Sequence, residues 1–99
     1  MEEELNMKVL ITGASSGIGR DIARELSKKG YELILVARDI EKLNQLKSEL
    51  RTKSEVVCMD ISKSENCREL HNKYNDIDIL VNNAGFGDCL LYTSDAADE

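Results

Sequence analysis

Three glycines, Gly13, Gly17 and Gly19, stand where the apolar run of residues 9–11 ends and a helical pattern begins. Glycines let the backbone come close to a pyrophosphate, because a Cβ atom would block the approach. Unpaired N–H groups at a helix start point outward, and the helix dipole adds partial positive charge there. The strand, turn and helix therefore predict a phosphate site, and a dinucleotide is the expected ligand. Ser15 and Ser16 could donate hydroxyl hydrogen bonds to the phosphate or simply favour the turn.

Two charged residues, Arg38 and Asp39, follow the next apolar run. An arginine at this point would pair with the 2′-phosphate of NADP, whereas an acid would accept a hydrogen bond from the ribose 2′-OH of NAD. Asp39 could face the ribose, but we interpret it as the N-cap of the following helix. The pair therefore favours NADP over NAD, and an ordinary surface arginine is the alternative.

Apolar runs and helical patterns alternate along the whole chain. Ile18, Ile22 and Leu26 recur at four-residue steps and predict one apolar helix face. The sequence predicts strands over residues 8–12, 32–37, 55–59 and 77–81, helices over 17–29 and 40–51, and a third helix that begins at a capping box in 62–65. This order predicts an α/β fold, the N-terminal half of a doubly wound, Rossmann-like parallel sheet with strand order 3-2-1-4.

Two motifs in this order resemble those of the short-chain dehydrogenase/reductase family. They are Thr12-Gly13-x-x-x-Gly17-Ile18-Gly19 and Asn82-Asn83-Ala84-Gly85, and the resemblance runs from Lys8 to about Asp88. It implies cofactor contacts from the glycine turn with Ile18, from Asp60 and Ile61 at the adenine, and from Asn82, Ala84 and Gly85 beside the sugar. Small residues there would let the backbone pass the cofactor, and Asn82 would tie neighbouring strands together.

The resemblance implies an NADP-dependent oxidoreductase that moves hydride between nicotinamide and a carbonyl or alcohol. The family's catalytic tyrosine precedes a lysine by four residues, whereas Tyr92 is followed at that spacing by Ala96. We therefore expect only the cofactor-binding half here, without catalytic residues, and an inactive fragment. The alternative is a dinucleotide-binding regulatory or scaffold protein without turnover, which a downstream sequence lacking the tyrosine–lysine pair would support.

The composition argues against several classes of partner for this chain. Its 99 residues carry a net charge of −6, which argues against nucleic acid, and no apolar run reaches the length of a membrane span. Three cysteines without C-x-x-C spacing argue against a metal site. The acidic start and the odd cysteine count predict a cytoplasmic protein with reduced thiols. The family resemblance adds a small-molecule substrate and a homo-oligomer of the complete protein.

The last eleven residues, CLLYTSDAADE, show neither a helical face nor strand alternation. One reverse translation of this segment resembles a transposon adapter of sequencing libraries. We therefore expect a partial NAD(P)-binding domain over residues 1–88 and a tail over 89–99 that is adapter read-through. With the fourth strand as an unpaired edge, the isolated chain is expected to be marginally stable and prone to aggregation.

Overall fold

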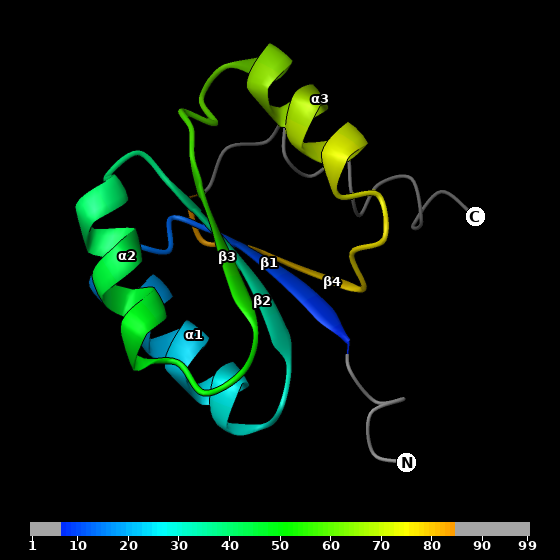
Figure 1. The fold of residues 1–99 in the computed structure, drawn as a ribbon. Coiled ribbons are helices and arrows are strands. Elements are labelled where there is room, and N and C mark those ends of the chain that lie inside the picture. Colours follow the sequence, from blue (N-terminus) through cyan, green and yellow to red (C-terminus); the bar gives the residue numbers. More distant parts are fainter. Residues whose placement is uncertain (1–6, 85–99) are drawn as a thin grey trace.

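A computed structural model describes residues 7–84 of the protein. The expected domain boundary near residue 88, the tail and Gly85 lie outside these residues. Strands and helices alternate throughout (Figure 1). The elements are β1 (Lys8–Thr12), α1 (Gly17–Lys28), β2 (Glu32–Ala37), α2 (Ile40–Glu49), β3 (Ser54–Cys58), α3 (Ser64–Lys73) and β4 (Ile79–Asn82). No helix among the described residues is long and apolar enough to cross a membrane.

The four strands form one parallel sheet in the order β3-β2-β1-β4, which confirms the predicted fold class. In the register of this sheet, Thr12 at the end of β1 lies between Val36 of β2 and Asn82 of β4. The segments that follow the strands therefore meet at one edge, where ligands bind in such sheets.

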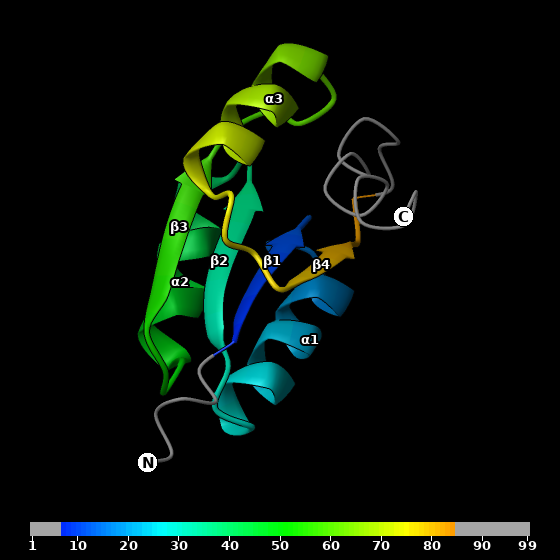
Figure 2. The same cartoon turned by 90° about the vertical axis from the view of Figure 1, so that its right-hand side faces the viewer.

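Helices α1 and α2 lie on one side of the sheet and α3 on the other (Figures 1 and 2), and an apolar layer lies on each side. Alternate strand residues point to opposite faces, so the continuous apolar runs of β1 and β2 fill both layers. The layer under α1 and α2 contains Val9, Ile11, Ala14, Ala23, Leu33, Leu35, Ala37, Leu43 and Leu46. The layer under α3 contains Leu10, Ile34, Val36, Ile61, Cys67, Leu70 and Tyr74.

The predicted inner face of α1 is wrong at its first residue. Ile18 is 68% exposed, and the residues that α1 buries against the sheet are the small ones Gly19, Ala23 and Ser27. Ile22 and Leu26 pack beside them and are partly buried. Small side chains let the helix axis approach the sheet closely, so the line of closest contact follows size rather than apolar character.

The predicted capping box at the start of α3 is also wrong. Ser62 donates to Asp60 through both its backbone N–H and its hydroxyl, at 3.0 and 2.7 Å, and so closes a turn before the helix. The helix begins after Lys63, which makes no side-chain capping bond. The neighbouring strands also differ slightly from the prediction. β3 begins and ends one residue earlier than predicted, and β4 spans Ile79–Asn82 instead of residues 77–81.

Ser27 joins α1 to the end of α2. Its hydroxyl oxygen accepts from the backbone N–H groups of Arg51 and Thr52 at 2.9 and 3.1 Å. On the exposed side, the Arg24 guanidinium meets the Glu49 carboxylate at 2.8 Å. A buried hydroxyl thus accepts hydrogen bonds from two backbone donors of the loop that follows α2.

Tyr74, at the end of α3, fixes that helix to β3. Its hydroxyl donates to Glu55 at 2.6 Å, and burial together with this carboxylate raises the pKa of Tyr74 to about 12. The neutral phenol therefore stabilises the fold fully below the ordinary tyrosine pKa of 10.0, and this stabilisation is lost as the pH rises through about 12.

We predict that the Tyr74→Phe variant shows a smaller loss of stability between pH 10 and about 12, because it lacks the buried phenol whose ionisation opposes folding. Urea unfolding at several pH values checks this, with Tyr31→Phe as the matched control that retains the decrease. The same alkaline decrease in Tyr74→Phe as in the unchanged chain would contradict the assignment.

Candidate functional site

A cleft of about 240 Å³ opens where the strands end. It brings together six of the residues that the sequence assigned to a cofactor site, and adds Ala37, Met59 and Ser62. The six are Gly13, Ser15, Arg38, Asp60, Ile61 and Ala84. The other assigned residues that the structure describes, Ser16, Gly17, Ile18, Gly19 and Asn82, do not line this cleft.

The three positions of the glycine turn differ in whether, and why, the structure requires glycine there. Gly13 has a φ of +67°, a backbone conformation that favours glycine. A Cβ atom on Gly19 would lie 2.2 Å from the carbonyl oxygen of Gly13, so packing of the turn requires glycine there. A Cβ atom on Gly17 would meet nothing within 4 Å. Internal packing does not require that glycine, and its open position at the start of α1 fits the close approach of a ligand.

The sequence left two roles open for Ser15 and Ser16, a hydrogen bond to phosphate and stabilisation of the turn, and the structure separates them. The Ser16 hydroxyl donates to the Gly13 carbonyl oxygen at 3.0 Å and accepts from the Gly19 N–H at 3.1 Å. Ser16 is thus the N-cap of α1, and its hydrogen is engaged within the turn. Ser15 lines the cleft. This arrangement favours the turn-forming role for Ser16 and leaves Ser15 as the serine that faces a ligand.

Two polar residues that we did not assign to the site, Thr12 and Asn83, hold the turn against the segment after β4. The buried Thr12 hydroxyl donates to Asn82 Oδ1 at 2.9 Å and accepts from the Ala84 N–H at 3.2 Å. The Asn83 amide donates to the Gly13 carbonyl oxygen at 3.0 Å and to Ser16 Oγ at 2.9 Å.

The bond between Thr12 and Asn82 confirms that Asn82 ties neighbouring strands. A polar residue at the end of an otherwise apolar strand is the sequence signal that could have identified Thr12. Asn83 stands in the second motif of the family resemblance, but the sequence does not reveal its role, because its partner Gly13 lies seventy residues away.

Asp60 and Ile61 form the β3 side of the cleft. Hydrogen bonds from Ser62 hold the pKa of Asp60 below its ordinary value, with the larger effect from the hydroxyl and the smaller from the backbone N–H. The positive charge of Arg38 also lowers this pKa. Asp60 is therefore an anionic hydrogen-bond acceptor at the cleft. Ile61 is 5% exposed and packs mainly into the layer under α3, so its side chain offers the cleft little surface.

Arg38 and Asp39 follow β2 with separate roles. The Asp39 carboxylate accepts from the Lys42 N–H at 3.1 Å, which confirms it as the N-cap of α2. Arg38 is exposed and lines the cleft, while its backbone carbonyl accepts a bond from the Cys58 thiol. Of this pair, the structure therefore places the cationic side chain at the cleft and engages the acid in the helix.

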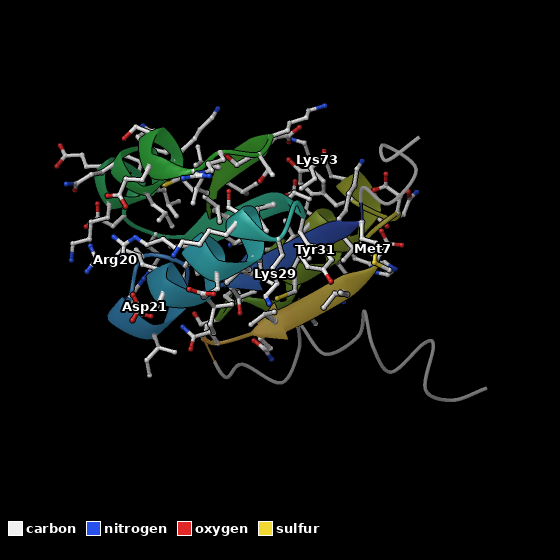
Figure 3. The ribbon with its side chains drawn as sticks, turned by 90° about the horizontal axis from the view of Figure 1, so that it is seen from below. Met7, Arg20, Asp21, Lys29, Tyr31 and Lys73 are labelled. Atoms are coloured by element: carbon white, nitrogen blue, oxygen red, sulfur yellow. The ribbon has the colours of Figure 1, made fainter. Side chains whose placement is uncertain are left out.

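The start of α1 is suited to an anion. Its first turn carries no acidic residue, and its N-terminus adjoins the glycine turn. Arg20 and Asp21 come directly after Gly19 in α1. Both lie at the opposite end of the molecule from Met7 (Figure 3). Arg20 Nε is buried without a hydrogen-bond partner in the described part of the chain.

Comparison with known proteins gives a consistent match. The family model described as short chain dehydrogenase matches residues 7–99. An 11-beta-hydroxysteroid dehydrogenase from Pinus massoniana is 41% identical over 92 residues, which cover 85% of this chain and 26% of that protein. The 3-oxoacyl-(acyl-carrier-protein) reductase FabG from Rickettsia prowazekii is 43% identical over 76 residues, which cover 77% of this chain and 32% of that protein.

Among solved structures, a metagenomic short-chain oxidoreductase in complex with NADP superposes with a TM-score of 0.70 at 36% identity. The match covers 80% of this chain and 39% of that one. The chain thus spans about a quarter to a third of the length of the two curated relatives above.

We predict that Gly19→Ala destabilises the fold by about 3 kcal/mol, because the new methyl group must displace the Gly13 backbone. Gly17→Ala is the matched control, and its free energy of unfolding should stay within about 0.5 kcal/mol of the original, as at an open surface position. Urea unfolding measures both. Equal stability of the two variants would show that the turn does not have this geometry.

Proposed function

Because this chain belongs to the short-chain dehydrogenase family, we propose that it forms the NADP-binding part of an oxidoreductase. The observation that carries the proposal is one cleft that joins the glycine turn, the cationic Arg38 and the anionic Asp60. These groups match the three chemical parts of the cofactor, namely its pyrophosphate, its 2′-phosphate and its adenine.

In this proposal the N–H groups at the start of α1 and the Ser15 hydroxyl hold the pyrophosphate. The Asp60 carboxylate accepts a hydrogen bond from the exocyclic amine of adenine, and Ile61 lies beside the ring. Ala84, together with Gly85 beyond the described residues, leaves room for the sugar. Gly17, Ile18 and Gly19 shape and border the same approach, and Asn82 acts behind it through Thr12.

The preference for NADP over NAD rests on which charged group stands at the cleft. Arg38 can pair with a 2′-phosphate, whereas the acid that would recognise a free ribose hydroxyl, Asp39, is engaged as the cap of α2. The solved relative that holds NADP is consistent with this choice.

When bound, the cofactor supplies hydride exchange with a carbonyl or alcohol substrate. The named activities of the relatives, a 3-oxoacyl reductase and a hydroxysteroid dehydrogenase, support this reaction class for the complete protein. Among residues 7–84, neither Tyr31 nor Tyr74 has a lysine four positions later, so we assign cofactor binding alone to these residues. A small-molecule substrate, a homo-oligomeric state and a cytoplasmic location belong to the same proposal.

We predict that Arg38→Ala weakens NADP binding at least about tenfold, the loss expected for a charge-assisted hydrogen bond, and leaves NAD binding unchanged. Titration of the complete protein by calorimetry with each cofactor measures this. Arg68→Ala, which removes an exposed arginine of α3, is the matched control and should change neither affinity. Tighter binding of NAD than of NADP by the unchanged protein would overturn the cofactor preference.

A further inference from the structure

A second cavity of about 280 Å³ lies between β3 and α3. The second cavity is lined by Val57, Met59, Glu69, Leu70 and Lys73. Met59 is the residue that also lines the cleft, where it stands directly before Asp60. Met59 therefore borders both the cleft and the second cavity.

We infer that Met59 is a specificity-determining wall, which excludes dinucleotides that carry a bulky substituent on the adenine amine. The inference rests on the proposed function, because it requires the adenine to lie beside Asp60. When Met59 is shortened, the two cavities join, and the space behind it receives an apolar substituent.

The walls of the second cavity suit a neutral apolar group. Leu70 is 1% exposed and Val57 packs against the same apolar layer, so both present hydrocarbon. Glu69 and Lys73 lie one helical turn apart on the exposed side of α3 and carry opposite charges. This rim has no net charge to attract or repel a charged substituent, and the apolar floor favours an aromatic ring.

The backbone at Met59 is held independently of its side chain. Its N–H donates to the Ala37 carbonyl oxygen at 2.9 Å, and the next residue, Asp60, is held by Ser62. The thioether is partly buried against the layer under α3 and is a side chain that adapts easily to its surroundings. Shortening it removes a wall without releasing the turn that presents the Asp60 carboxylate.

The test compares the affinities of the complete protein for NADP and for NADP with a benzyl group on the adenine amine. Calorimetric titration gives both dissociation constants for the unchanged protein and for Met59→Ala. Met59→Val, a smaller change in volume, provides a second variant if Met59→Ala folds poorly. The matched control is Val57→Ala, which enlarges the second cavity but leaves the Met59 wall in place.

We expect the unchanged protein to bind NADP at least about tenfold more tightly than the benzyl derivative. Met59→Ala should reduce this ratio about tenfold, a change of about 1.4 kcal/mol, and Val57→Ala should leave it unchanged. NADP binding with the same ratio in all proteins, or the same reduction in Val57→Ala, would overturn the inference and leave the proposed function intact. Absence of NADP binding to the unchanged protein would overturn both.

Discussion

The hydrogen bonds between the glycine turn and the segment after β4 are the interaction on which the site depends. Thr12 bonds to Asn82 and Ala84, while Asn83 bonds to Gly13 and to the cap of α1. Two turns that are distant in sequence thereby become one rigid edge. That edge fixes the direction in which the N–H groups at the start of α1 point, and so decides where an anion is held.

The close packing of α1 on the sheet is the second condition for this arrangement. Gly19, Ala23 and Ser27 form the buried line of the helix, and their small size lets the helix start lie against the Gly13 backbone. At the other end of the helix, Ser27 joins α1 to the loop after α2. The position of the anion site therefore follows from side-chain volume along one helix face as well as from the turn.

Most of the fold could be predicted from the sequence, because continuous apolar runs and glycine turns report parallel strands and their connections directly. Asp39 as a helix cap and Arg38 at the cleft followed from their places after a strand. Prediction failed where long-range packing or competition between local bonds decides the outcome. Ile18 continues a four-residue period and is nevertheless exposed, and Ser62 bonds backward to Asp60 instead of capping α3.

The central claim is that binding of a phosphate, and not the packing of the fold, requires glycine at position 17. Calorimetric titration of NADP into the complete protein with Gly17→Ala tests it most directly, when read beside the unfolding of the same variant. We predict affinity at least about tenfold weaker with an unchanged free energy of unfolding, because the added methyl group meets no protein atom within 4 Å and would lie where we propose that the phosphate binds. NADP binding by this variant at the affinity of the unchanged protein would contradict it.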